Sequence, residues 1–341
     1  MNFAAFQTWR EHCLCLNPNL LDCAETNLYR SLRYLQPKPA APEKDHRVHR
    51  CDLARDWLSR FGLPAILSRQ ALVCRGVRHA LTLIFGELAR KNAVLWIPND
   101  VYPVYLEIAR KAGVEPRLYS TLPQPRLPAF LTNAGTEYLL VTNPWKPLGR
   151  YLTVEECDNL SLWLNGSPQR HLLLDCVYDL GEVFHATTLK LLSTGRAILL
   201  HSVTKGWLWP KTFGVALIGK DHSEFESVFR NDSPTPEQLC LAKQLFSTDT
   251  DCPNRVVDAL DARARKLFIA LPQPVYQSIP TEPRNSAKGC YFFPVRIPAQ
   301  VLLAQHKVIG IPASAFGANW DGSILTSLSE LFAPTKEGVA A

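Results

Sequence analysis

Short apolar segments alternate with amphipathic segments over most of the chain. Each apolar segment is followed by a loop with glycine, proline or polar residues, and then by residues with the spacing of a helix. Continuous apolar runs are typical of strands buried on both faces, and their alternation with helices predicts a mainly parallel sheet between two layers of helices. The strands predicted for this sheet are Leu72–Cys74, Ala93–Ile97, Glu137–Thr142, His171–Asp175, Ala197–Ser202 and Phe213–Ile218.

The two ends of the chain have different patterns. Residues 1–36 predict a helix followed by an irregular arm, and residues 221–280 are polar with helical spacing. Residues 285–333 predict a last α/β segment with a short strand at Val308–Ile311. We therefore expect an N-terminal arm and helix (1–50), a large domain (51–270), and a small C-terminal α/β domain (271–341) to which the N-terminal segment contributes.

The composition narrows the class of protein. The 341 residues are 47% hydrophobic and 20% charged, which is typical of a globular protein with a large core. The net charge of +6 is mild and no block of Lys and Arg stands out, so we expect no nucleic-acid partner. No stretch has the length and apolarity of a signal peptide or a membrane span, so we expect a cytoplasmic protein without membrane association and with reduced cysteines. The spacing of Cys and His gives no complete metal-binding pattern, and no metal site is expected.

Polar residues follow four of the predicted strands. Ligands of mainly parallel sheets bind beyond the carboxyl ends of the strands, so these positions are the candidates for chemistry. Each segment alone is weak, because Asn-Pro usually marks a turn and a lysine after a strand is usually solvated. The four segments are Pro98–Pro103, Asn143–Gly149, Asp175–Tyr178 and Ser202–Lys205.

Taken together, the order and spacing of these segments resemble the class I/II aminotransferases, which are fold-type I pyridoxal-phosphate enzymes. That family has an Asn-Pro loop, then Asp-x-x-Tyr, then Ser-x-x-Lys. The resemblance runs from about Arg75 to Leu328 and includes Lys288–Phe293 and Gly310–Gly317 near the C-terminus. It implies a seven-stranded-type, mainly parallel sheet, pyridoxal 5'-phosphate as the cofactor, a homodimer, and a small amine or amino acid as the substrate.

The resemblance assigns the central roles. Lys205 would hold the cofactor as a Schiff base, and after release would move protons at the substrate carbon. Asp175 would keep the pyridine nitrogen protonated. Tyr178 and Asn143 would hydrogen-bond the phenolic oxygen of the ring. Structural interpretations remain open: Asn143 as a turn residue, Asp175 as a helix cap and Tyr178 as part of the core.

The same resemblance suggests how the ring and its phosphate are held. Tyr102 would stack on the ring, with Tyr105 as the alternative. The start of a helix would bind the phosphate through its free N–H groups, together with a hydroxyl group. The residues assigned to the phosphate are Gly76, Val77, Arg78 and Ser202.

Two arginines of the family pattern are missing. The phosphate-binding arginine corresponds to Phe213, and Lys211 is the nearby candidate to replace it. The arginine that clamps the substrate carboxylate corresponds to Thr326. The substrate therefore lacks an ordinary α-carboxylate, or another arginine binds it; the candidates are Arg296, Arg284 and Arg30.

The N-terminal segment faintly resembles the substrate-facing loop of aminocyclopropane-carboxylate synthases and their relatives. This resemblance would bring Glu25 and Asn27 to the substrate, whereas the alternative is an arm that packs on a partner subunit. The missing arginines favour an aminotransferase-like enzyme of specialised biosynthesis. The same site could also serve a lyase, a decarboxylase or a cyclase, and the second alternative is a non-catalytic scaffold or sensor.

Overall fold

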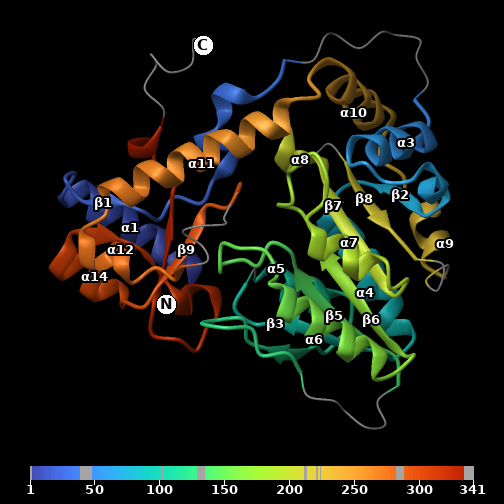
Figure 1. Cartoon of the computed structure of the whole chain (residues 1–341), viewed down its shortest axis with the longest axis horizontal. Helices are drawn as coiled ribbons and strands as arrows, with labels where there is room; N and C mark the ends of the chain where they lie inside the picture. Colours follow the sequence, from blue (N-terminus) through green and yellow to red (C-terminus); the bar gives the residue numbers. More distant parts are fainter. Residues whose placement is uncertain are drawn as a thin grey trace.

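The computed structural model describes most of the chain (Figure 1). The described residues are 2–38, 48–101, 103–128, 135–210, 213–219, 222, 224–281 and 288–333. Three residues that the sequence singled out, Tyr102, Lys211 and Arg284, lie outside these ranges.

A seven-stranded sheet forms the larger part of the molecule. Its strands lie in the order β2, β8, β7, β6, β5, β3, β4. The pairs from β7 through β6, β5 and β3 to β4 are parallel, and only β8 runs antiparallel to its neighbours, so the predicted mainly parallel sheet is confirmed. The strands are β2 (Ala71–Cys74), β3 (Val94–Pro98), β4 (Arg117–Tyr119), β5 (Glu137–Thr142), β6 (Arg170–Asp175), β7 (Ala197–Ser202) and β8 (Gly214–Leu217).

Helices cover both faces of this sheet, which explains its continuous apolar runs. Successive residues of a strand point to opposite faces, so Leu139 and Val141 of β5 enter one core while Tyr138 and Leu140 enter the other. One face is covered by α4 (Val77–Arg90), α5 (Val104–Lys111) and α9 (Glu224–Asn231). The other is covered by α3 (Arg50–Arg60), α6 (Val154–Asn165), α7 (Ala186–Leu192) and α10 (Pro236–Thr248).

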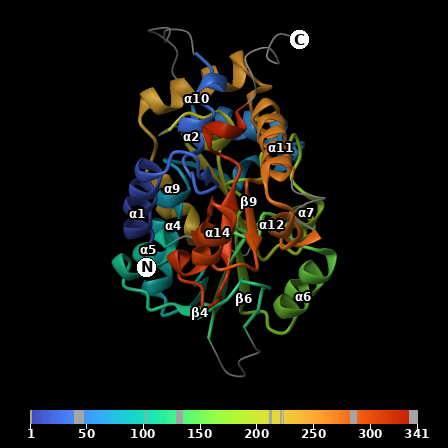
Figure 2. The same ribbon diagram turned by 90° about the vertical axis from the view of Figure 1, so that its left-hand side faces the viewer.

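A smaller part combines segments from both ends of the chain. The antiparallel strands β11 (Ile311–Pro312), β12 (Ser323–Thr326) and β9 (Phe292–Val295) form one sheet, and β1 (Leu21–Asp22) pairs with β10 (Val308–Ile309). The long helix α11 (Cys252–Ala270) runs from α8 toward this part, which faces the viewer in Figure 2. The helices around these strands are α1 (Phe3–Leu16), α12 (Gln273–Gln277) and α14 (Ala299–His306).

The remaining elements are short. Two of them, α2 (Leu28–Ser31) and α8 (Val203–Gly206), approach the sheet edge where β5, β6 and β7 end. The 3-10 helices are η1 (Arg33–Leu35), η2 (Ala65–Arg69), η4 (Ala313–Phe316) and η5 (Glu330–Phe332).

Two predictions about strands were wrong. The single strand expected at Val308–Ile311 is interrupted at Gly310. The residues before it form β10, which pairs with β1, and those after it form β11, which pairs with β12. The edge strand β4 was not predicted, because Arg117 and Leu118 are exposed and the strand therefore lacks an apolar run.

Candidate active site

Lys205 lies in α8, directly after β7, and its amine faces aromatic rings. Its Nζ atom is 4.6 Å from the centre of the Tyr29 ring and 5.4 Å from that of Tyr178. Burial and the nearby charge of Arg78 lower the pKa of Lys205 to about 8, although the Asp175 carboxylate opposes the shift. A substantial fraction of the Lys205 amine is therefore neutral, and nucleophilic, near neutral pH.

Asp175 ends β6, next to β7, and its carboxylate is buried. The Tyr105 hydroxyl donates to one carboxylate oxygen at 2.5 Å, and the backbone N–H of Val177 donates to the other at 3.1 Å. Burial raises the pKa of Asp175, while these bonds and the amines of Lys146 and Lys205 oppose the rise. Tyr105 thus contacts the predicted site through Asp175.

A second lysine, Lys146, lies against Tyr178. The Nζ atom of Lys146 is 3.3 Å from the centre of the Tyr178 ring, and it donates to the Tyr291 hydroxyl at 3.4 Å. Burial and the charge of Lys205 lower the pKa of Lys146 well below its ordinary value. Lys146 is not among the site residues predicted from the sequence. Its place between two prolines of the Asn-Pro loop, which follows a predicted strand, could have indicated it.

The Asn143 side chain forms hydrogen bonds to residues that were not predicted to belong to the site. Its amide donates to the hydroxyls of Thr187 and Thr188 at 3.1 and 2.8 Å, and its oxygen accepts the N–H of Leu152 at 3.0 Å. These bonds hold the start of the loop against α7, which favours the turn interpretation of this residue. Lys146, rather than Asn143, is the polar group of this loop beside Tyr178.

The start of α4 has the features of a phosphate site. Gly76 has a φ of 130° and is the N-cap residue of the helix, which has no side-chain cap hydrogen bond. The backbone there is closely packed, since a Cβ atom on Gly214 would lie 3.0 Å from the Gly76 Cα. Arg78 is exposed, and the Ser202 hydroxyl is bonded to that of Thr204. The first N–H groups of a helix beside a buried lysine fit the phosphate and aldehyde of pyridoxal phosphate.

Comparison with known proteins decides the family. The model of the family "Aminotransferase class I and II" matches residues 50–324. The chain belongs to this family. Membership implies pyridoxal 5'-phosphate as its cofactor. No curated protein matches the sequence.

Solved structures of the same fold are similar at low sequence identity. A Thermus thermophilus aspartate aminotransferase variant is 17% identical, with a TM-score of 0.67 over 97% of this chain and 93% of the other. A methionine aminotransferase from Escherichia coli is 17% identical, with a TM-score of 0.66 over the same shares. A protein assigned as a β-cystathionase from Corynebacterium diphtheriae is 14% identical, with a TM-score of 0.62 over 92% and 89%. At these identities the similarity establishes the fold alone.

Phe213 is the residue to which the sequence resemblance assigns the family's phosphate-binding arginine. Its ring is fully buried in the core, 5.7 Å from the ring of Phe246. An apolar core position cannot contribute a phosphate ligand, and Lys211, the predicted replacement, lies outside the described residues.

Thr326, to which the sequence resemblance assigns the missing carboxylate-binding arginine, is fully buried. Its backbone N–H donates to the carbonyl oxygen of Cys23 at 2.7 Å, and its hydroxyl donates to that of Glu25 at 2.6 Å. Thr326 therefore fastens the N-terminal segment to β12. Of the candidate replacements, Arg296 and Arg30 are both exposed.

The N-terminal segment reaches the site through a residue that was not predicted. The Glu25 carboxylate pairs with Arg10 at 3.4 Å and accepts the N–H of Asn27 at 2.8 Å. The Asn27 side-chain oxygen accepts the backbone N–H of Arg30 at the start of α2. These bonds position α2, from which Tyr29 faces Lys205. No sequence pattern marked Tyr29, because its neighbour Lys205 is far away along the chain.

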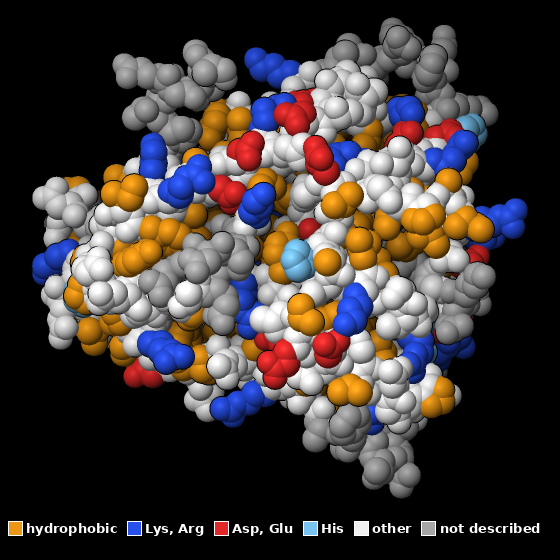
Figure 3. Space-filling model, in the orientation of Figure 1, with side chains coloured by type: hydrophobic (Ala, Val, Ile, Leu, Met, Phe, Trp, Pro, Cys, Tyr) orange, Lys and Arg blue, Asp and Glu red, His pale blue; other side chains and the backbone are white. Residues whose placement is uncertain are grey.

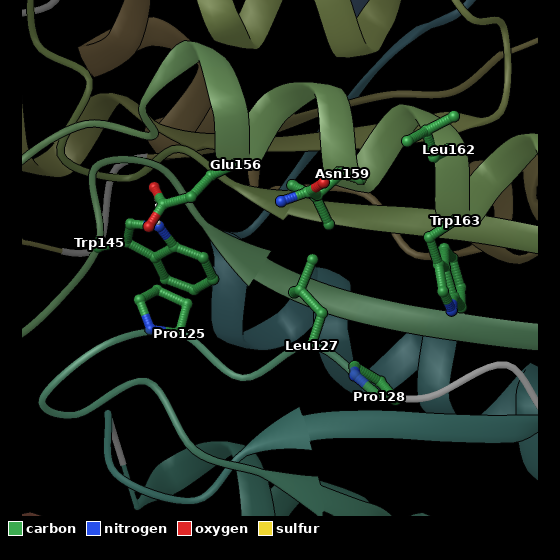
Figure 4. A pocket seen from close by; sticks show the side chains of 9 residues that line it. Pro125, Leu127, Pro128, Trp145, Glu156, Asn159, Leu162 and Trp163 are labelled. Atoms are coloured by element: carbon green, nitrogen blue, oxygen red, sulfur yellow. Dashed lines mark hydrogen bonds between the residues drawn. The ribbon is translucent and has the colours of Figure 1, made fainter.

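A hollow beside α6 is lined by none of the predicted site residues. It has a volume of about 300 Å³ and lies between α6, Trp145 and the segment Pro125–Pro128, as Figure 4 shows. The Trp145 side chain lines it, whereas the next residue, Lys146, faces Tyr178. The residues around the hollow are Pro125, Leu127, Pro128, Trp145, Glu156, Asn159, Leu160, Leu162 and Trp163.

The surface adds little to the functional assignment. On the face seen in Figure 3, Lys and Arg side chains are interspersed with Asp and Glu. Within the described residues, no helix has the length and apolarity to cross a membrane. The same part of the chain contains no cluster of three or more His, Cys, Asp or Glu suited to a metal ion.

Proposed function

We propose that the protein is a pyridoxal-phosphate-dependent enzyme that acts on the amino group of a small amino acid or amine. The observation that carries this proposal is the Lys205 amine, which lies within electrostatic reach of both Asp175 and Arg78 at the start of α4. These three groups correspond to the aldehyde, the ring nitrogen and the phosphate of the cofactor. When bound, the cofactor supplies an electron sink for the substrate carbon that carries the amine.

Each residue of the site would have a separate role in binding the cofactor or in moving protons. Lys205 would hold the cofactor covalently at its aldehyde carbon, with the aldehyde oxygen lost as water. Once a substrate amine has taken its place on the cofactor, the Lys205 amine would hold and move a proton at the substrate carbon. Asp175 favours the charged form of the pyridine nitrogen, and the first N–H groups of α4 bind the phosphate. Tyr29 and Tyr178 keep water away from the Lys205 amine.

Among reactions on this fold, we propose transamination in specialised biosynthesis. Family membership supports transamination, and Thr326 in place of the carboxylate-binding arginine supports an unusual substrate. A lyase, a decarboxylase or a cyclase is the alternative, since all three use the same electron sink. A non-catalytic scaffold is the second alternative, supported by Phe213 and Thr326 but opposed by the retention of Lys205 and Asp175.

We also propose that the protein is cytoplasmic, as its sequence suggests, and that it is a homodimer, as the family resemblance implies. Light scattering on the purified protein tests the dimer: a mass twice that of the 38.3 kDa chain is expected, and a monomer would contradict it.

A screen of amines and amino acids tests the reaction. The protein loaded with pyridoxal 5'-phosphate is mixed with each compound, and the cofactor is then extracted and identified. A transaminase converts the cofactor to pyridoxamine phosphate and the donor to a carbonyl compound. A lyase or decarboxylase changes the substrate but returns the cofactor unchanged. If no compound changes the spectrum of the bound cofactor or is itself consumed, the scaffold alternative is favoured.

A further inference from the structure

Lys146 is held in place by a rigid loop between β5 and α6. The N–H of Trp145 donates to the carbonyl of Arg150 at 2.7 Å, and the N–H of Gly149 donates to that of Trp145 at 3.0 Å. Gly149 has a φ of 69° and passes so close to the Phe292 backbone that no side chain fits there. The position of the Lys146 backbone is therefore fixed by the fold.

The amine of Lys146 is enclosed by aromatic rings and has no acidic partner at ion-pair distance among the described residues. Besides Tyr178 at 3.3 Å, its Nζ atom lies 4.6 Å from the ring centre of Phe292 and 5.2 Å from that of Tyr291. Aromatic faces attract a cation, but they do not make up for the water molecules that the buried ammonium group has lost, and they provide no anionic partner. Such a lysine is suited to receive an anionic oxygen from a ligand.

The charged and titratable groups around Lys146 come from three elements. Lys205 follows β7 and disfavours a charge on Lys146, whereas Asp175 at the end of β6 favours it. The thiol of Cys290, just before β9, favours the charge as well. The titratable rings of Tyr178 and Tyr291 also face the Lys146 amine.

The order of strands places Lys146 on one particular flank of the cofactor. The α4 start follows β2 at one end of the order β2, β8, β7, β6, β5, while Lys205, Asp175 and Lys146 follow β7, β6 and β5 in turn. In pyridoxal phosphate, the aldehyde carbon and the ring nitrogen lie opposite each other, with the phosphate arm on one flank and the phenolic oxygen on the other. If the phosphate binds at α4, the phenolic oxygen faces the loop that carries Lys146.

We propose that Lys146 binds the phenolic oxygen of the cofactor and brings a second amine into the site, whose charged form the anionic oxygen favours. This inference rests on the proposed function and replaces the role predicted for Asn143. A cationic donor beside this oxygen stabilises its negative form and disfavours a proton on the neighbouring Lys205 nitrogen. Lys146 therefore lowers the pKa of the chromophore that Lys205 forms with the cofactor.

A spectroscopic pH titration tests this role without measuring activity. The wild-type protein and the variants Lys146→Met and Lys146→Gln are loaded with pyridoxal 5'-phosphate, and their visible absorption is recorded from about pH 5 to about pH 10, the range in which the chromophore should titrate. Loss of a charged hydrogen bond corresponds to about one to two pKa units, so Lys146→Met should raise the midpoint by that amount. Lys146→Gln keeps a neutral donor and should give a smaller rise.

The matched control is Lys190→Met, which removes an exposed lysine of α7 that pairs with Asp158. It should leave the midpoint unchanged. Equal midpoints in wild type, Lys146→Met and Lys146→Gln would overturn the role of Lys146 and leave the proposed function intact. A wild-type protein that forms no visible chromophore at all would instead overturn the proposed function. Circular dichroism identifies a variant that fails to fold, and the glutamine variant then decides.

Discussion

The reactivity of Lys205 should depend on pH in a way that an ordinary lysine's does not. At pH 7 a lysine with the ordinary pKa of 10.5 is neutral in about 0.03% of molecules, whereas a pKa of about 8 gives about 9%, a ratio of about 300. Only the neutral amine attacks an aldehyde. The rate at which cofactor-free protein captures pyridoxal 5'-phosphate should therefore rise with pH and level off above about pH 8.

Stopped-flow absorbance measures this rate across the pH range, with Lys205→Arg as the control that abolishes capture. The structure also predicts the direction of a second shift. Because the Arg78 charge lowers the pKa of Lys205, Arg78→Met should move the midpoint upward. A wild-type rate that still climbs steeply above about pH 10 would mean that Lys205 has the pKa of a solvated lysine, and the buried geometry of the site would then be wrong.

Three substitutions test the framework around the site. Gly149→Ala should destabilise the fold by about 2 to 4 kcal/mol in urea unfolding, because the new Cβ would lie 1.8 Å from the Phe292 carbonyl oxygen. The helical control Gly86→Ala, which has open space, should be neutral or slightly stabilising, and equal losses in the two variants would refute the close approach. Phe213→Arg introduces the residue of the family pattern, but it buries a charge in the core, so it should lower the melting temperature without tightening cofactor binding. Tighter cofactor binding in a titration would show that this position faces the phosphate. Thr326→Val should cost about 1 to 3 kcal/mol of unfolding free energy through the lost bond to the N-terminal segment, and no change would remove that role.

The elements of the sheet were predictable because their signals are local. The strand β5 has the predicted bounds, since it is a continuous apolar run, and α4 begins at the predicted position directly after Gly76, whose backbone takes a positive φ. The position of Lys205 and Asp175 at neighbouring strand ends follows from the same pattern. The edge strand β4, with only Tyr119 buried, carries no such signal.

The side-chain contacts within the site were harder to predict. Asn143 and Lys146 stand in one loop, and only the three-dimensional structure shows that the first is bonded to α7 while the second faces Tyr178. Tyr29 meets Lys205 across a long separation in sequence, and Thr326 meets Glu25 across a longer one. Periodicity and spacing describe neighbours along the chain, so contacts of this kind depend on how distant elements pack.

The most direct test of the central proposal is borohydride reduction of the protein loaded with pyridoxal 5'-phosphate, followed by mass mapping of the labelled peptide. The visible band should bleach, and the label should be found on Lys205, while Lys205→Ala should carry none. A label on Lys146 or on a surface lysine, with Lys205 unmodified, would contradict the assignment of the site.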